Sequence, residues 1–185
     1  MTGYARFIDD TEIEYSELNK EEYGERYGYF HDYIRDMAVC DCTFFNCKTI
    51  RDVSLPETFN HVGCHAFHGC ERLTRCFIPE TVKCIDEHAF STCFNLQFLE
   101  LPEGISEVSY CVCEHCPNLS IVKLPSTIRR IRVGAFSHCS NLTVIVFNGT
   151  VAQWNNIPKD RDWDLHCGEY AVRCNDGAIQ MKFAN

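Results

Sequence analysis

Cysteine and histidine are the residues of this sequence whose types and spacing could do chemistry. Residues 111–116 read CVCEHC, which overlaps the C-x-C and C-x-x-C spacings typical of metal and redox sites. Residues 64–70 read CHAFHGC and place two cysteines and two histidines in one short stretch. Both segments support the hypothesis of a thiol-dependent metal or redox protein, which has to be weighed against the arrangement of all fourteen cysteines.

The arrangement of the cysteines indicates an internal repeat. Five of them recur at a constant spacing of 23 residues, which marks stacked structural units and not a set of disulfide bridges. This column consists of Cys47, Cys70, Cys93, Cys116 and Cys139. We expect all five to face inward as free, small, apolar thiols.

The same period predicts a strand in each unit. The phrase L-x-x-L-x-L-P is clearest in Leu96, Leu99, Leu101 and Pro102. Its last two leucines follow the two-residue period of a strand, and the proline should end that strand. A unit of 23 residues cannot close a core alone, but stacked units bury one another's apolar faces, so the sequence predicts a mainly β repeat solenoid.

The repeat columns divide the CVCEHC segment. Cys116 belongs to the cysteine column, and Cys113 occupies a column that holds phenylalanine in other units, so both should point inward. Cysteine is much smaller than phenylalanine and should leave a hole there. Val112 and Tyr110 are the residues best placed to fill it.

The CHAFHGC segment is divided in the same way. Cys70 should face inward, and Ala66-Phe67 should separate the other candidate ligands. A surface column offers one candidate ligand from each of four consecutive units: Cys42, His65, His88 and Cys111. These positions would spread over roughly 14 Å in a line, whereas tetrahedral zinc needs its ligand atoms about 2.0–2.3 Å from one centre. His65 and His88 could share an adventitious ion, but we predict no functional metal site and no cofactor.

Composition and charge exclude several functions. The 185 residues carry a net charge of -9, so the chain should repel nucleic acid and anionic membranes. It has no apolar run of the roughly 18 residues that a membrane helix needs, and acids stand where a signal peptide is apolar. We therefore expect a cytoplasmic protein, or a cell-surface or secreted one if a leader was removed. The sequence has no phosphate-binding glycine loop, HExxH or GxSxG, so no catalytic residue and no enzyme activity are predicted.

Three phrases of the repeat resemble a known family. LPETFNHVGCHAFHGCERL, IPETVKCIDEHAFSTCFNL and LPSTIRRIRVGAFSHCSNL are similar to the BspA-like leucine-rich repeats of bacterial and protist surface proteins. The tail that begins FNGTVAQWNNIP resembles the C-terminal cap that often ends such arrays, so the resemblance covers about residues 38 to 180. It implies a right-handed leucine-rich-repeat solenoid of about five rungs with parallel strands. It also implies an adhesive or partner-binding role without shared catalytic residues.

The N-terminal segment should cover the first rung. Residues 1–38 are expected to form an acidic cap, and residues 39–147 the repeats. Asn19 followed by Glu22 has the spacing of a capping box, which favours a helix start. Apolar residues then recur at helical spacing: Tyr23, Tyr27, Phe30 and Ile34. We therefore predict an amphipathic helix in this cap.

Residues 148–185 should cover the other end of the array. Thr150 can cap a short helix that ends at Pro158. Residues 175–177 read NDG, whose residue types tolerate the positive φ of tight turns, and this predicts a β-hairpin. Trp154, Trp163 and Tyr170 are expected to pack this cap and not to bind a ligand.

Outward positions of the repeat strands are the predicted binding site, because a solenoid is free to vary there. The candidate residues are Arg75, Phe77, Phe98, Glu100, Ile121, Lys123, Val144 and Val146. Opposite charges should pair between neighbouring rungs, as with Asp52 and Arg75 or with Glu100 and Lys123. The interpretation is a non-catalytic module that recognises a protein or peptide whose identity is unknown. Three alternatives remain. The outward apolar residues could be there only because β-forming residues favour strands. The chain could also be a purely structural spacer, or a thiol-dependent metal or redox protein.

Overall fold

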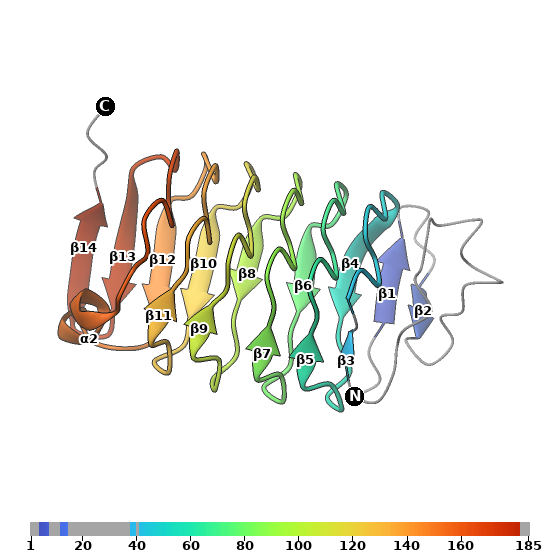
Figure 1. Ribbon diagram of the computed structural model, residues 1–185, viewed down its shortest axis with the longest axis horizontal. Helices are drawn as coiled ribbons and strands as arrows, with labels where there is room; N and C mark the ends of the chain where they lie inside the picture. Colours follow the sequence, from blue (N-terminus) through green and yellow to red (C-terminus); the bar gives the residue numbers. More distant parts are fainter. Residues whose placement is uncertain (1–3, 8–11, 15–37, 40, 182–185) are drawn as a thin grey trace.

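A solenoid of stacked coils forms the described part of the chain, which comprises residues 4–7, 12–14, 38–39 and 41–181 of the computed structural model. Figure 1 shows the coils side by side along the long axis, with one long sheet and shorter strands in front of it. The long sheet has the order β14-β13-β12-β10-β8-β6-β4-β1-β2. Its strands are β1 (Tyr4–Phe7), β2 (Glu12–Glu14), β4 (Ile50–Ser54), β6 (Arg75–Phe77), β8 (Phe98–Glu100), β10 (Ile121–Leu124), β12 (Val144–Phe147), β13 (Tyr170–Cys174) and β14 (Gly177–Met181).

Six strands of this sheet run parallel, namely β4, β6, β8, β10, β12 and β13. Equivalent residues of successive units face each other, because a constant repeat length keeps every coil in the same phase. In β10, Val122 and Leu124 are buried, whereas Ile121 is exposed and Lys123 is half-buried. The predicted two-residue alternation is confirmed, and so is the mainly β solenoid with parallel strands.

Two short sheets lie on the other side of the core, in front of the long sheet in Figure 1. The first contains β3 (Ala38–Val39), β5 (His61–Val62) and β7 (Cys84–Ile85), and the second contains β9 (Glu107–Val108) and β11 (Arg130–Ile131). A six-residue turn follows in each coil, at residues 41–46, 64–69, 87–92, 110–115, 133–138 and 161–166. We call the surface formed by these short strands and turns the turn face.

Each six-residue turn contains two residues with positive φ. The first positions are Cys42, His65, His88, Cys111, Gly134 and Asp162, and the second are Asn46, Gly69, Thr92, His115, His138 and His166. At Gly69 a Cβ would lie 2.0 Å from the Asn46 Oδ1 atom, so a larger residue there would have to displace the Asn46 side chain. Elsewhere, backbone hydrogen bonds between coils hold the left-handed conformation; the His65 N–H donates to the Glu87 carbonyl at 3.1 Å. Five histidines occupy these positions, in agreement with the enrichment of histidine in the left-handed region.

The predicted cysteine column lies in the core, and all five of its members are fully buried. Four of these thiols, and Cys167 beyond them, donate to a backbone carbonyl of the preceding coil. The S···O distance is 3.1 Å for Cys70 to Phe44, Cys93 to Phe67, Cys116 to Phe90 and Cys139 to Cys113, and 3.0 Å for Cys167 to Phe136. The column therefore links successive coils, and the inward orientation is confirmed.

The C-terminal segment adds a sixth coil where the sequence predicted about five. Cys167 follows Cys139 after 28 residues and not 23, because the helix α2 (Val151–Asn156) is inserted between them. The Phe136 N–H donates to the Trp163 carbonyl at 2.7 Å and continues the ladder of the earlier turns. β13 then pairs in parallel with β12 and makes the last rung.

The predicted cap elements are present at this end. The Thr150 side chain accepts from the Gln153 backbone N–H, and the Gln153 side chain accepts from the Thr150 backbone N–H. These two hydrogen bonds form a capping box at the start of α2. β13 and β14 form the predicted hairpin around residues 175–176, although neither turn residue has a positive φ. Instead, the Asp176 carboxylate accepts from the Val151 N–H at 2.7 Å and fastens the hairpin to the helix.

The N-terminal segment contributes two strands that the sequence analysis did not predict. β1 pairs antiparallel with β4, with Ala5 opposite Val53, and β2 pairs antiparallel with β1. Ala5 is fully buried, so this addition covers the first coil. The helix expected from Asn19 onward lies outside the described residues. Among the residues that the structure describes, no helix has the length and apolar character needed to cross a membrane.

Candidate functional site

The strand face consists of the outward side chains of β6, β8, β10 and β12, and it contains all eight predicted binding residues. One row across the sheet runs from Arg75 through Phe98 and Ile121 to Val144, each opposite the next. In a second row, Glu100 lies opposite Lys123, and Lys123 lies opposite Val146. The repeat geometry thus brings residues that are 23 apart in sequence into contact on one surface.

The apolar members of the strand face differ in exposure. Phe77 is 49% exposed and Ile121 is 36% exposed, whereas Phe98, Val144 and Val146 are half-buried. A shallow hollow lies between the two phenylalanines. Its other lining residues are Cys76, Ile78, Glu80, Glu100 and Pro102. The lining thus combines apolar side chains with the carboxylates of Glu80 and Glu100.

Charged side chains frame this apolar area. The Lys123 ammonium lies 3.4 Å from the Glu100 carboxylate and 5.3 Å from the centre of the Phe98 ring. The Arg75 guanidinium lies 3.7 Å from the carboxylate of buried Asp52. Both predicted opposite-charge pairs are confirmed. The Lys123–Glu100 pair is exposed to solvent and contributes only a few tenths of a kcal/mol to stability.

The CVCEHC segment does not form one thiol site. Cys113 and Cys116 are fully buried in the core, whereas Cys111 lies half-buried on the turn face. Burial, reinforced by Glu114, raises the pKa of Cys111 to about 11. A thiol that stays protonated at neutral pH is a poor nucleophile. The expected inward orientation of Cys113 and Cys116 is confirmed.

Another cluster on the turn face joins His61, Cys84 and Asp86. The His61 Nε2 atom lies 2.7 Å from one Asp86 oxygen, and the Cys84 thiol donates to the other at 3.1 Å. Burial and the Asp86 carboxylate raise the pKa of Cys84 to about 11, which again disfavours the thiolate that redox exchange requires. Asp86 also lies near Cys64 and Asp41 in a further group of candidate ligands.

Histidine rings gather on the turn face in a way that the sequence analysis missed. Ala66 and Phe67 are buried, yet the rings of His65 and His68 on either side of them lie 5.2 Å apart. The His88 ring of the next coil stacks on His65 at 4.8 Å. The expectation that Ala66-Phe67 keeps these ligands apart is therefore wrong for the two histidines. The signal in the sequence was the three-residue step from His65 to His68 combined with the 23-residue step to His88.

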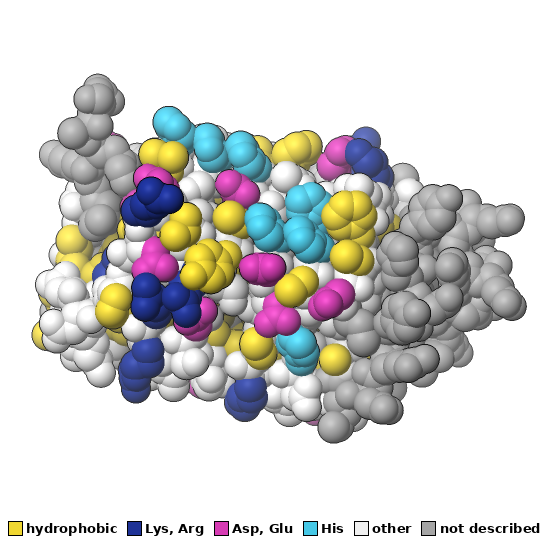
Figure 2. Space-filling view, viewed as in Figure 1, with side chains coloured by type: hydrophobic (Ala, Val, Ile, Leu, Met, Phe, Trp, Pro, Cys, Tyr) yellow, Lys and Arg dark blue, Asp and Glu magenta, His cyan; other side chains and the backbone are white. Residues whose placement is uncertain are grey.

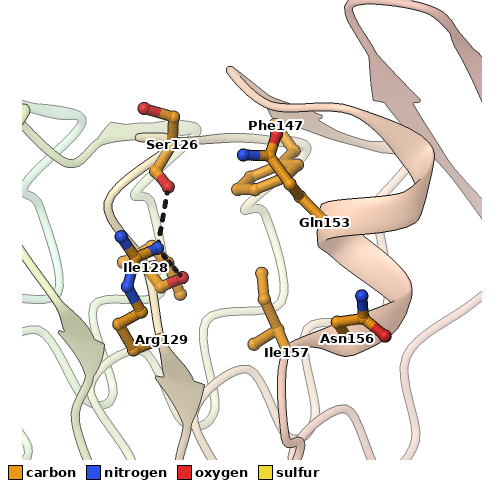
Figure 3. Close-up of a pocket in the computed structure, with 7 residues that line it drawn as sticks. All are labelled: Ser126, Ile128, Arg129, Phe147, Gln153, Asn156 and Ile157. Atoms are coloured by element: carbon orange, nitrogen blue, oxygen red, sulfur yellow. Dashed lines mark hydrogen bonds between the residues drawn. The ribbon is translucent and has the colours of Figure 1, made fainter.

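The cap region contains two polar features of structural character. The Tyr170 hydroxyl donates to the buried Asp164 carboxylate at 2.6 Å, and burial raises the pKa of Asp164. A small hollow separates α2 from the preceding coil, with Phe147 and Ile157 on its apolar side and Arg129 at its rim (Figure 3). The Arg129 guanidinium there donates to the Ser126 and Ile128 carbonyls at 3.3 and 3.5 Å. The first feature ties two parts of the cap together, and the second stays within the coil before it.

Aromatic packing in the cap is as predicted. Trp154 lies 5.5 Å from Phe147 and 6.1 Å from Trp163, and Trp163 lies 6.3 Å from Tyr170, all measured between ring centres. Trp154, Trp163 and Tyr170 are buried. Their rings therefore fill the end of the core.

The stacked coils, the in-register parallel strands and the buried cysteine column define a leucine-rich-repeat solenoid. The family model for the BspA type leucine rich repeat region matches residues 37–156 in six copies. This match spans more than half of the chain, so the protein belongs to the BspA-type leucine-rich-repeat family. Members of this family and fold are typically not enzymes. No curated protein matches the sequence.

Solved structures of bacterial repeat proteins share the fold. A leucine rich repeat protein of T. pallidum is 27% identical with a TM-score of 0.58, over 68% of this chain and 63% of its own. A leucine rich cell surface protein of Faecalibacterium prausnitzii is 26% identical with a TM-score of 0.62, over 66% of this chain and 32% of its own. The pneumococcal vaccine antigen PcpA matches at 11% identity and a TM-score of 0.52, over 92% of this chain and 48% of its own. The chain thus spans less than two thirds of these proteins.

Proposed function

We propose that this protein is a non-catalytic recognition module that binds a protein or peptide partner through its strand face. The observation that carries the proposal is the exposure of Phe77 and Ile121 on strands whose inward residues already fill the core. Large exposed apolar side chains that form one surface with charged neighbours are typical of contact sites. Membership of a repeat family whose proteins generally mediate interactions supports the same function.

The chemistry of the hollow indicates what the partner presents. Phe77 and Phe98 offer aromatic surface to an apolar side chain, and Glu80 and Glu100 attract a positive charge beside it. The chain is acidic overall, with a net charge of -9, which further favours a basic partner segment. The best-matching partner is therefore a peptide or protein loop with a basic residue next to an apolar one.

The location follows from the same proposal. The likeness to the cell surface protein of Faecalibacterium prausnitzii supports the surface alternative. On a surface, the strand face would meet partners outside the cell, as an adhesin does.

A double substitution on the strand face tests the function. Phe77→Asp with Ile121→Lys replaces two exposed apolar side chains by charges and leaves the buried columns intact. We would measure how much partner protein the chain captures from cell extracts and from cell surfaces. The amount captured by the double variant should fall by at least about tenfold, because truncating central interface residues typically costs more than 1 kcal/mol each. The melting temperature should change little.

Phe94→Asp is the matched control. Phe94 is 42% exposed, close to the 49% of Phe77, but it belongs to the segment between a turn and a strand and not to the strand face. The control should capture the partner as the unsubstituted protein does. Equal loss of capture in the control and in the double variant would show that the strand face is not the site.

A further inference from the structure

Histidine side chains form two groups on the turn face, and Figure 2 shows both in cyan. One group contains His65, His68 and His88, and the other contains His115, His138 and His166. In the second group, the His138 ring lies between its neighbours and makes a row: it stacks on His115 at 4.1 Å and lies tilted beside His166 at 4.7 Å. The first group is a triangle, because His68 stands beside the row that His65 and His88 make.

The three imidazoles of the triangle bring one ring nitrogen each into one neighbourhood. One candidate ligand nitrogen from each of His65, His68 and His88 lies within 4.8 Å of the other two. A tetrahedral ion with metal–nitrogen bonds of about 2.0–2.1 Å holds its nitrogens about 3.3 Å apart. Binding therefore requires these nitrogens to move up to about 1.5 Å closer, and the His65 and His88 rings to turn out of their parallel stack, by rotation of side chains that are half-buried at the surface. Three nitrogens and one open position are also a coordination that zinc adopts in proteins.

The backbone that carries these rings is fixed before any ion arrives. The N–H groups of His65 and His88 donate to Glu87 and Tyr110 carbonyls of the following coils at 3.1 and 3.0 Å. The His68 N–H donates to the His65 carbonyl at 3.1 Å within the same turn. Ligands on such a repeated, hydrogen-bonded backbone lose little conformational entropy on binding.

The rings have lone pairs to offer. The Nδ1 atoms of His65 and His68 are buried, and neither has a hydrogen-bond partner among the described residues. Burial and the neighbouring histidines lower the pKa of both imidazoles, against the opposing pull of nearby carboxylates that include Glu87 and Glu114. The lowered pKa of His65 and His68 favours the neutral imidazole, which is the form that ligates metals. The same carboxylates give the site a negative surrounding that attracts a cation.

Phe45 completes the site. Its ring stacks on His68 at 5.0 Å with an interplanar angle of 8° and meets His65 edge-on at 6.1 Å. This aromatic wall packs against His68 and lowers the local dielectric beside the site.

We propose that His65, His68 and His88 form a binding site for a zinc-class divalent transition-metal ion, with a fourth coordination position open to solvent. Imidazole nitrogens suit zinc, nickel, cobalt and copper ions, and the absence of a carboxylate from this triangle disfavours calcium and magnesium. The site lies on the turn face, so it operates independently of the strand face. A metal there would clamp two consecutive coils together.

Metal titration of the full chain tests the site. Zn²⁺ added to metal-free protein should bind with a stoichiometry of one ion per chain, and it should raise the melting temperature of the protein. His65→Asn removes one ligand while keeping a residue type that tolerates the positive φ of 54° at this position. It should weaken zinc binding by at least about tenfold, since even the loss of an outer-shell partner commonly costs 10–100-fold. His68→Gln should do the same.

His138→Asn is the matched control, because His138 also has a positive φ, of 62°, and its ring also lies beside two others. It should bind zinc as tightly as the unsubstituted protein and show the same rise in melting temperature. Far-UV circular dichroism of the metal-free variants verifies folding. If His65→Asn does not fold, His68→Gln alone decides the result, since its backbone has no positive φ.

Three results would overturn the proposal. The first is the absence of zinc binding at micromolar concentrations. The second is equal binding by His65→Asn, His68→Gln and the unsubstituted chain, or an equal loss in His138→Asn, which would mean adventitious binding. The third is a thiolate-to-metal charge-transfer band on titration with Co²⁺ that Cys84→Ser or Cys111→Ser abolishes, which would move the ion to a cysteine-containing cluster.

Discussion

Four of the five thiols of the buried column donate to a carbonyl of the coil before them, so cysteine acts here as a small apolar residue that still donates one hydrogen bond. Cys93, for example, is fully buried and donates to Phe67 at 3.1 Å. Alanine would fill less volume and leave this contact unmade, and leucine would not fit the same space. The repetition of cysteine along the chain is therefore a packing requirement, and the spacing that resembled a redox motif arises from it.

Alkaline pH should destabilise the protein through the buried thiols of the core, which are those of the cysteine column and of Cys113. Burial raises the pKa of Cys70, Cys93 and Cys113 well above the ordinary value of 9.0. A raised pKa in the folded state means that the stabilisation is complete below the pKa of the unfolded thiol and is lost as pH rises above it. Urea unfolding in reducing buffer should therefore show a free energy of unfolding that falls from about pH 9 upward, by about 1.4 kcal/mol per pH unit for each buried thiol.

Cys93→Ala provides the control for this pH dependence. It should reduce the slope above pH 9 by about 1.4 kcal/mol per unit, because one titrating group is gone. A free energy of unfolding that stays constant between pH 8 and pH 10 would contradict the burial of the column.

Cys113 interrupts the stack of phenylalanines in the core. Phe44 stacks on Phe67 at 5.1 Å and Phe67 on Phe90 at 5.3 Å, but the next coil has Cys113. The prediction that Tyr110 fills the gap is wrong, because its side chain is 41% exposed.

Enlarging residue 113 while shrinking residue 112 tests this part of the core. Val112 is buried where three other coils have alanine, so we expect it to compensate for the missing ring. Cys113→Phe should be neutral or stabilising, and Cys113→Phe with Val112→Ala should raise the free energy of unfolding by about 1–3 kcal/mol. Thermal and urea unfolding measure both values. Strong destabilisation by the double variant would mean that the coil has repacked around the small side chain.

The strands were predictable because the repeat has a constant period. Once one coil is aligned with the period, the inward and outward residues of every other coil follow. The strand-face residues were found for this reason. The sixth coil was hidden because α2 (Val151–Asn156) shifts the phase after Cys139. β1 has no repeat partner in sequence, and its place beside β4 is decided by tertiary pairing at the sheet edge. The spacing of His65, His68 and His88 stood in the sequence, but only the six-residue turn, with His65 at a positive φ, shows that His65 and His68 lie on the same side of it.

The capping box of α2 gives a testable prediction. The Thr150 hydroxyl accepts from the Gln153 N–H at 3.1 Å, and the Gln153 side chain accepts from the Thr150 N–H at 2.8 Å. Thr150→Ala should lower the free energy of unfolding by about 1 kcal/mol. Since the two bonds support each other, Thr150→Ala with Gln153→Ala should cost less than the sum of the single changes, as a double-mutant cycle by urea unfolding would show. Strict additivity would mean that the two hydrogen bonds form independently.

For the whole molecule, the solenoid distributes its stability along one axis. Each coil contacts mainly its neighbours, so the ends carry the risk of fraying. At the C-terminal end, Trp154 closes the core: it is 2% exposed and lies between the rings of Phe147 and Trp163. The helix that bears it is short, and its stability therefore depends on this contact.

Trp154→Ala should open the C-terminal end without unfolding the middle of the solenoid. Large-to-small changes of a buried tryptophan typically cost about 3–5 kcal/mol. Hydrogen exchange followed by mass spectrometry should show the loss of protection concentrated in β12, β13 and β14, while β6 and β8 keep theirs, because coupling passes only between adjacent coils. Leu165→Ala, in the same coil but 41% exposed, should change the free energy of unfolding by less than about 0.5 kcal/mol. If Trp154→Ala accelerated exchange equally in all strands, the six coils would unfold as one cooperative unit, and the cap would act on the whole array and not on its neighbours alone.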